Sequence, residues 1–255
     1  MNKKTLLVCA LGALLTGVTS CTSQYKVVNV DRTCVVIDDR FDQSPDSAAL
    51  ALVAPYKVAV DSISCPVVGR AANSMERCKP ESRLSNLLSD ILVWGAQRVG
   101  EKPSFAIYNM GGIRATLTAG EVTYGDILDV APFENKLCVI SLTGEQVLTL
   151  MNEIASRGGE GVSGSVRMVI TKDNKLSSIK IDGKEIDKNK TYRIATLDYL
   201  AQGNDGMPTL GKGTDIKSLT EDKYNVRFII MDYFKSLMKQ GKAAKSDIEG
   251  RIIVK

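Results

Sequence analysis

Three loops carry the residue types whose spacing could bind or transform a ligand. The first spans residues 109–114 (NMGGIR) and directly follows a predicted strand that ends at Tyr108. Its two adjacent glycines would let backbone N–H groups approach a ligand closely, and Arg114 offers a planar fork of donors for phosphate or ribose oxygens. Taken alone, a Gly-Gly pair after a strand is more typical of a tight turn.

The second and third loops add aromatic rings and a carboxylate. Residues 131–135 (APFEN) place Phe133 beside a proline, which in isolation more often indicates a small satellite core. Residues 198–207 (DYLAQGNDGM) contain Tyr199 and a turn that would hold Asp205 at a fixed angle, although such an aspartate is usually a turn former. Together the loops supply two rings to sandwich a base and polar groups for its edges and for ribose hydroxyls. The combination indicates a nucleoside site as a hypothesis.

The composition restricts the chemistry that the chain can perform by itself. None of the 255 residues is histidine. A Ser-His-Asp or Cys-His nucleophile needs an imidazole base, and many zinc sites and most dinuclear metallohydrolase centres need imidazole ligands. Any chemistry must use carboxylates, arginines or lysines, or a partner must supply it. The net charge is only +4 and no polybasic patch occurs, so we expect no nucleic-acid ligand.

The N-terminal residues have the pattern of an export signal. Residues 1–4 are basic, residues 5–17 form an uncharged apolar run too short to span a bilayer comfortably, and Val18-Thr19-Ser20-Cys21 follows. The tetrad resembles a bacterial lipobox, in which the cysteine is acylated. We predict a signal peptide over residues 1–20, lipidation of Cys21, and an exported protein that is lipid-anchored to a bacterial membrane, in the periplasm or at the cell surface. The alternative is an ordinary signal peptide with a chance cysteine.

Four further cysteines follow the lipobox: Cys34, Cys65, Cys78 and Cys138. They form no CxxC pair and the chain has no histidine, so we predict no metal site and no cofactor in this chain. In an exported protein Cys65 could form a disulfide with Cys78 across a short loop. Buried free thiols are an equally good interpretation, and the sequence leaves both open.

The spacing of apolar residues predicts the elements that would position the loops. Leu84, Leu87, Leu88 and Ile91 recur at steps of three and four and predict a long helix over residues 81–100. Further helices are expected over residues 47–62 (capped by Asp46, with a partial apolar stripe that Pro55 breaks), 124–130, 143–156 and 225–240. Strands are expected over residues 65–69, 104–108, 120–123, 136–142 and 251–255.

Two groups of strands have a predicted pairing. Residues 25–30 and 33–38 indicate a hairpin or two adjacent strands, and residues 166–171, 177–181 and 191–196 indicate a meander. The mixture of long helices and antiparallel hairpins predicts an α+β fold with a mixed β-sheet. After the signal peptide, we assign residues 21–57 to a lipidated tether with N-terminal strands and a linker helix, and residues 58–255 to one domain.

The order of several motifs resembles a known family. NMGGIR, APFENKL, LTGEQV and DYLAQGNDG follow one another, and a terminal EGRI closes the series. This order is similar to the C-terminal domain of the 5'-nucleotidase family, which includes ecto-5'-nucleotidases and periplasmic UDP-sugar hydrolases. The similarity covers residues 58–255 and includes residues 80–87 (PESRLSNL), which resemble the segment that opens a helix in the family. The resemblance implies a domain that recognises a nucleotide, while a separate calcineurin-like domain holds two metals and performs hydrolysis.

The resemblance also implies roles for individual residues of the three loops. Contacts to base, ribose or phosphate are implied for Asn109, Gly111, Gly112 and Arg114. The rings of Phe133 and Tyr199 would sandwich the base, and Asp205 would bond the ribose hydroxyls.

Some residues depart from the family pattern or lack a certain counterpart. Tyr199 stands where the family often has phenylalanine, and Met110, Asn204 and Met207 replace a small residue, a glycine and a phenylalanine. These departures put the shape of the loops in question. Family arginines before the long helix also approach the ligand, and the candidates for them are Arg77, Lys79 and Arg83.

The metallophosphatase half has no counterpart, because residues 22–57 are too few to hold it. The leading hypothesis is therefore a lipid-anchored recognition half, inactive alone and completed by a separately encoded calcineurin-like metallophosphatase chain that holds the divalent metals. The alternatives are a stand-alone nucleoside- or nucleotide-binding surface lipoprotein, and a structural lipoprotein whose site has decayed. The intact loop residues count against the last.

Overall fold

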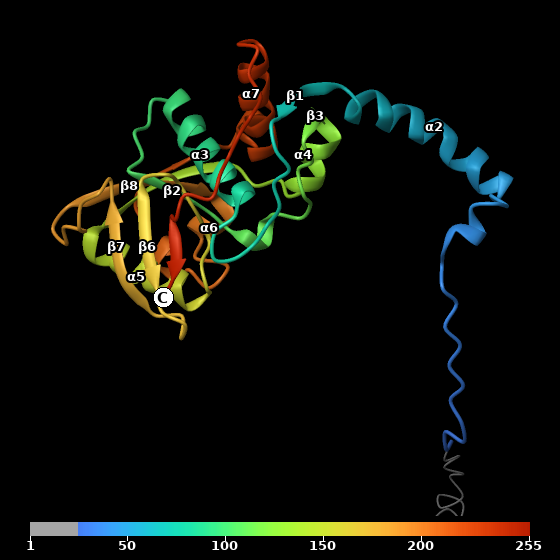
Figure 1. Cartoon of the computed structure of the whole chain (residues 1–255), viewed down its shortest axis with the longest axis horizontal. Helices are drawn as coiled ribbons and strands as arrows, with labels where there is room; N and C mark the ends of the chain where they lie inside the picture. Colours follow the sequence, from blue (N-terminus) through green and yellow to red (C-terminus); the bar gives the residue numbers. More distant parts are fainter. Residues whose placement is uncertain (1–24) are drawn as a thin grey trace, which may run out of the picture. The chain divides into compact units, whose positions relative to one another are not determined.

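The computed structural model describes residues 25–255 (Figure 1). Its α-helices are α2 (Ser47–Ser64), α3 (Arg83–Arg98), α4 (Tyr124–Val130), α5 (Gly144–Ser156), α6 (Asp198–Ala201) and α7 (Val226–Met238). Its strands are β1 (Val67–Ala71), β2 (Phe105–Tyr108), β3 (Gly120–Thr123), β4 (Leu137–Thr143), β5 (Gly161–Val162), β6 (Val166–Ile170), β7 (Leu176–Ile181), β8 (Thr191–Leu197), β9 (Thr214–Ser218) and β10 (Ile252–Val254). Short 3-10 helices are η1 (Asp39–Phe41), η2 (Met110–Gly112), η3 (Pro208–Lys212) and η4 (Asp222–Tyr224). The chain divides into two units, Met1–Leu52 and Val53–Lys255.

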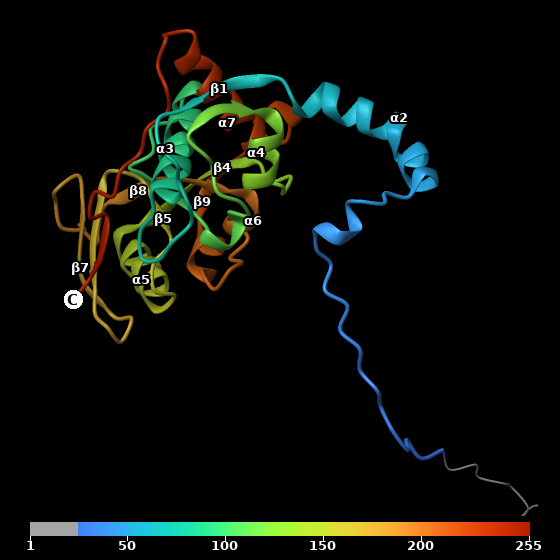
Figure 2. The same ribbon diagram turned by 45° about the vertical axis from the view of Figure 1, so that its right-hand side comes forward.

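A five-stranded mixed sheet carries the three loops. Its order is β5-β2-β8-β4-β9, with β2 parallel to β8 and with β4 antiparallel to both β8 and β9. All of β2 and most of β8 are buried, as is typical of strands covered on both faces. Helix α3 packs along this sheet, against β2 and β5 above all (Figure 2). The predicted α+β fold with a mixed sheet is confirmed.

The predicted meander is wrong in its third strand. β6 and β7 pair antiparallel, but β8 lies between β2 and β4 in the larger sheet. The other neighbour of β6 is β10, the C-terminal strand, which runs parallel beside it in Figure 1. Burial explains the difference, because β7 exposes half of its side chains whereas β8 is largely apolar and needs cover on both faces.

The predicted strands at residues 25–30 and 33–38 are also wrong. These residues form no strand, and side chains such as Val28 and Ile37 are 95% and 87% exposed. A two-stranded hairpin is at best marginally stable in water without a further strand or a helix to cover it. The β-branched composition of these runs is therefore insufficient by itself to form strands.

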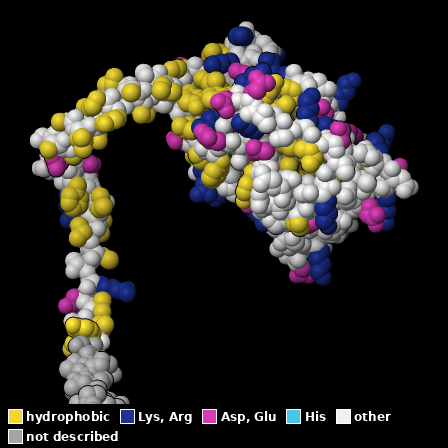
Figure 3. All heavy atoms as spheres, turned by 180° about the vertical axis from the view of Figure 1, so that it is seen from behind, with side chains coloured by type: hydrophobic (Ala, Val, Ile, Leu, Met, Phe, Trp, Pro, Cys, Tyr) yellow, Lys and Arg dark blue, Asp and Glu magenta, His cyan; other side chains and the backbone are white. Residues whose placement is uncertain are grey.

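The predicted helices are confirmed. Capping residues and the spacing of apolar residues are local features of the sequence, which makes helices predictable. Ser82 and Ser85 form a capping box at the start of α3, whose apolar stripe is buried. Asp46 Oδ1 accepts the backbone N–H groups of Ala48 and Ala49 at the start of α2. No residue of α2 is buried by any part of the chain that the structure describes, and hydrophobic side chains lie along the helix surface in Figure 3.

Candidate functional site

The sheet brings the three predicted loops to one edge. β2 and β8 run parallel, so residues 109–114 and residues 198–207 leave the sheet on the same side. β4 is antiparallel to β8, so residues 131–135 enter at that side as well. The loops surround a pocket of about 410 Å3, lined by Asn109, Gly111, Gly112, Arg114, Phe133, Asn135, Tyr199 and Asp205. The structure thus brings together every residue predicted to bind the nucleotide and adds Asn135.

Asp205 is held in place by two neighbours. It lies in the left-handed region, with φ of 53°, between turn glycines that also have positive φ. Asn109 Nδ2 donates to its Oδ2 at 2.5 Å, and the Tyr199 hydroxyl donates to its Oδ1 at 3.1 Å. This hydrogen bond to a carboxylate, together with the repulsion between the carboxylate charge and a phenolate, raises the pKa of Tyr199. Each oxygen retains a lone pair that could accept a ligand hydroxyl.

The two aromatic rings are on the surface of the pocket rather than in the core. Phe133 is 47% exposed and Tyr199 is 38% exposed, which contradicts the satellite-core interpretation of Phe133. The Arg114 guanidinium lies 5.8 Å from the centroid of the Phe133 ring, within cation–π range. Arg114 Nη1 also donates to the Gly111 carbonyl at 3.4 Å. Both aromatic side chains are therefore accessible to a ligand in the pocket.

Gly112 leaves room for the amide of Asn109. A Cβ at residue 112 would come within 2.8 Å of Asn109 Oδ1, so any side chain there would displace the amide. Asn109 Oδ1 is buried and accepts no hydrogen bond from the described residues. A buried acceptor without a donor is costly unless a ligand or water supplies one.

Three of the residues that depart from the family pattern, Met110, Asn204 and Met207, do not line the pocket. Met110 and Met207 are buried in the protein, at 2% and 0% exposure. Asn204 Nδ2 donates to the Tyr199 carbonyl at 2.8 Å and so ties the turn to α6.

The three basic candidates before α3 do not line the pocket. Arg77 Nη1 donates to the carbonyls of Met110 and Ile113 and so supports the glycine loop from behind. Lys79 Nζ contacts Glu160 at 3.4 Å, and Arg83 lies 4.0 Å from the Asp247 carboxylate.

Glu160 supports the same loop and was missed by the sequence reasoning. Its side chain is buried, and its Oε2 accepts the N–H of Met110 at 2.5 Å. Its Oε1 accepts from Arg157 Nε at 2.8 Å. Its position after a Gly-Gly turn carried no signal, because only the folded chain places it behind residue 110.

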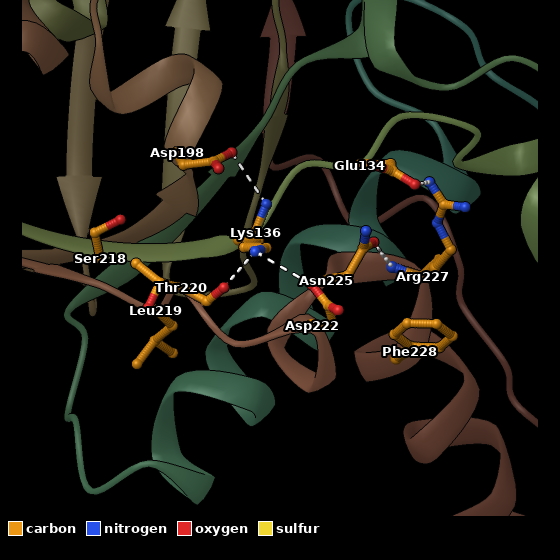
Figure 4. Close-up of a pocket in the computed structure, with 10 residues that line it drawn as sticks. All are labelled: Glu134, Lys136, Asp198, Ser218, Leu219, Thr220, Asp222, Asn225, Arg227 and Phe228. Carbon is orange, nitrogen blue, oxygen red and sulfur yellow. Dashed lines mark hydrogen bonds and ion pairs between the residues drawn. The ribbon is translucent and has the colours of Figure 1, made fainter.

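A second cavity of about 630 Å3 lies behind the Phe133 loop (Figure 4). Successive residues of the loop line the two cavities in turn: Glu134 and Lys136 line the second cavity, whereas Phe133 and Asn135 line the pocket. Lys136 is bonded to the Thr220 carbonyl and to Asp222, at 3.5 Å from its Oδ1. Acidic and basic groups are mixed along this wall.

The cysteines within the described residues are free thiols. Cys34, Cys65 and Cys78 are exposed and Cys138 is buried, so the Cys65–Cys78 disulfide is not formed and the prediction of buried thiols is correct only for Cys138. Burial, with a smaller effect of the Asp198 charge, raises the pKa of Cys138 to about 11. Cys21 and the predicted signal peptide lie outside the described residues.

Residues 25–255 contain neither a candidate membrane-spanning helix nor a candidate group of metal ligands. None of the helices described there is both long and apolar enough to cross a membrane. No three His, Cys, Asp or Glu side chains of residues 25–255 are placed so that they could hold a metal ion.

Residues 67–212 match the family model of the 5'-nucleotidase C-terminal domain. The chain belongs to this family. The UshA protein of Yersinia enterocolitica is 32% identical over 192 residues, which cover 72% of this chain and 34% of that protein. A 5'-nucleotidase of Vibrio vulnificus is 38% identical over 113 residues, 43% of this chain and 20% of that protein. The 5'-nucleotidase precursor of Thermus thermophilus has a similar fold, with a TM-score of 0.66 at 26% identity.

The matches cover only part of the length of the relatives. The Thermus structure is covered over 42% of its length, against 81% of this chain. This 5'-nucleotidase C-terminal domain chain therefore spans less than half of each of these relatives. The pocket at the sheet edge lies within the part that matches the family.

Proposed function

We propose that the chain is the nucleotide-recognition half of a 5'-nucleotidase and binds a nucleoside or nucleotide in the pocket at the sheet edge. The observation that carries the proposal is the lining of that pocket: two exposed aromatic rings beside a carboxylate and an arginine. A flat base would stack between Phe133 and Tyr199, since every base has a face for stacking. Asp205 would accept hydrogen bonds from ribose hydroxyls, and Arg114 with the glycine N–H groups would bind phosphate or ribose oxygens.

The hydrolytic step would come from a separately encoded calcineurin-like metallophosphatase chain with its divalent metals. The absence of histidine from all 255 residues supports this division of labour. The recognition half alone would then release no phosphate.

Helix α2 offers a surface for such a partner. Leu52, Val53, Tyr56, Val60 and Ile63 recur at helical spacing and are between 50% and 70% exposed. An isolated helix of this length is marginal in water, so an apolar stripe of this size needs cover. α2 ends just before residue 67, where the family match begins, and the remainder of a longer relative would precede that point. We propose that the metallophosphatase chain packs on this stripe.

The proposal includes export and a lipid anchor at Cys21, based on the lipobox-like Val-Thr-Ser-Cys tetrad. Replacing Cys21 by serine should release the protein from the membrane fraction or block its processing. A Cys21→Ser variant that fractionates and migrates like the parent would contradict the anchor.

A stand-alone nucleoside- or nucleotide-binding lipoprotein is the second candidate. The observation that favours it is that the three loops form a pocket with two exposed rings, an arginine and a carboxylate. In that case ligand binding would need no partner and would lead to no hydrolysis.

Titration calorimetry of the purified chain with adenosine and AMP tests the shared part of both candidates. Phosphate release from AMP is then measured with divalent metal, with and without the metallophosphatase chain encoded in the same genome. Release only in the mixture, lost in a Tyr56→Asp variant that still binds AMP, is the result expected of a half-enzyme. Binding without release in any mixture would favour the second candidate, and an absence of binding would overturn both.

A further inference from the structure

The β4–β8 ladder ends beside the pocket in a residue pair in which a side chain makes one of the two hydrogen bonds. Leu137 pairs with Leu197, and Lys136 and Asp198 come next. Asp198 N donates to the Lys136 carbonyl at 2.9 Å, as an antiparallel ladder requires. The return bond runs from Lys136 N to Asp198 Oδ1 at 3.0 Å, because the backbone turns into α6 at residue 198. The carboxylate thus takes the place of a ladder carbonyl.

The same oxygen also holds the first turn of α6. Tyr199 N donates to Asp198 Oδ1 at 2.8 Å. One oxygen therefore joins the backbone just after the Phe133 loop to the backbone that carries the Tyr199 ring. Figure 4 shows Asp198 bonded to Lys136 from the side of the second cavity, and Asp198 is absent from the lining of the pocket.

The Phe133 loop is fixed on its other side by α7. Arg227 Nη2 donates to the Pro132 carbonyl at 3.0 Å, and Val226 N donates to the Asn135 carbonyl at 2.9 Å. Since this loop is anchored independently, a change at Asp198 would act mainly on the position of Tyr199 relative to it.

We propose that Asp198 is a positioning residue that sets the gap between the Phe133 and Tyr199 rings. The inference rests on the proposed function, in which a base occupies that gap. Stacked rings attract only within a narrow range of separation, with centroids about 4.5–7 Å apart. A small displacement of α6 would therefore weaken stacking although Asp198 touches no ligand.

Calorimetric titration of the full chain with adenosine tests this role. Asp198→Ala should weaken binding about ten-fold, whereas Asp198→Asn should weaken it less than about three-fold, because an amide oxygen can accept both N–H groups. Asp126→Ala is the matched control, since Asp126 Oδ2 accepts the Thr123 N–H at 2.7 Å at the start of α4, away from the pocket lining. Binding by Asp198→Ala at parental strength would overturn the proposal, and so would equal losses in Asp198→Asn or in Asp126→Ala.

Amide hydrogen exchange separates this inference from the function on which it rests. In Asp198→Ala the amides of Lys136 and Tyr199 should exchange faster than in the parent, with or without a nucleoside. Unchanged exchange of both amides would show that the Asp198 carboxylate does not stabilise the backbone at Lys136 and Tyr199. Failure of the parent to bind adenosine, with exchange altered as expected, would overturn the proposed function and leave the brace as a structural contact.

Discussion

Two polar clusters of this protein use the same kinds of groups in opposite ways. At the pocket, Asp205 receives hydrogen bonds from Asn109 and Tyr199 beside rings that are open to solvent. Near the C-terminus, the Arg251 side chain is 2% exposed and forms a two-pronged pair with Asp90, at 2.9 and 2.7 Å. Its remaining donors bond to Glu249 and to the carbonyls of Asn86 and Val162.

The difference lies in what each cluster leaves unused. The donors of Arg251 are bonded to groups of the protein, and Glu81 accepts from the backbone N–H groups of Glu249 and Arg251. We call this cluster closed, because its polar groups are bonded to one another. Asp205 keeps free lone pairs, and the buried Asn109 Oδ1 has no donor among the described residues. A closed cluster contributes to stability, whereas an open one is available to a ligand. The predictions below separate these two effects.

The largest effect is expected at the closed cluster. Arg251→Ala should lower the free energy of unfolding by about 3 kcal/mol or more, because it leaves buried carbonyls without donors and removes a paired charge. Urea denaturation measures this loss. Arg167→Ala, whose side chain is 45% exposed and lies 3.9 Å from the same Glu249, is the control and should change stability by less than about 1 kcal/mol. Equal losses would mean that burial of the cluster is unimportant.

The aromatic pair should show the reverse pattern. Phe133→Ala and Tyr199→Ala should each weaken adenosine binding by about ten-fold or more, since stacking on an aromatic ring contributes roughly 1–3 kcal/mol per base. Both rings are exposed, so the urea midpoint should hardly move. Titration calorimetry and denaturation of the same samples give both values. If both variants bind like the parent, the rings do not contact a base and the nucleotide site must be abandoned.

Asp205 should distinguish ligands with a ribose from those without its hydroxyls. Asp205→Asn should cost about 1 kcal/mol for adenosine, by weakening hydrogen bonds to a charged acceptor, and less for 2',3'-dideoxyadenosine. Tyr199→Phe keeps the ring and should change affinity less than Asp205→Asn does. A loss that is equal for both nucleosides would contradict the ribose contact.

The smallest effect concerns a third ion pair, of intermediate exposure. A hydrogen bond from Arg193, aided by Lys217, lowers the pKa of Glu101. A lowered carboxyl pKa stabilises the fold above the unfolded value of about 4.3, and that stabilisation is lost as pH falls through the lowered value. Glu101→Gln should therefore be less stable than the parent at pH 7, and the gap should shrink by pH 3. Urea denaturation at both pH values measures it, and a gap that is independent of pH would contradict the assignment.

Much of the fold could be predicted because its signals are local. Ser82 before the Leu84–Leu88 stripe defines the start of α3, and Asp46 defines the start of α2. Strand pairing is harder to predict from the sequence, because β8 pairs with β2 and β4, which are distant from it in the chain. The runs at residues 25–38 misled for the same reason, since a β-branched composition does not reveal whether a third strand is present.

The pocket residues could be predicted because the chain orders three motifs that resemble one family. Phe133, Tyr199 and Asp205 line one pocket as that resemblance implies, and their contacts with a ligand remain a prediction. Asn135 could have been added, because it lies two residues from Phe133 in the same loop. Glu160 and Asp198 act on backbone N–H groups of loops, and nothing in their local sequence shows which amide a carboxylate will reach.

The anchoring of the Phe133 loop to α7 bears on how this module could be excised or shuffled. The family match ends at residue 212, yet the bonds to Pro132 and Asn135 come from residues 226 and 227. A fragment cut at residue 212 would retain every residue that lines the pocket and lose the support of one ring. A fragment that keeps the Phe133 loop supported must therefore extend beyond the segment that the family model matches, through at least Arg227.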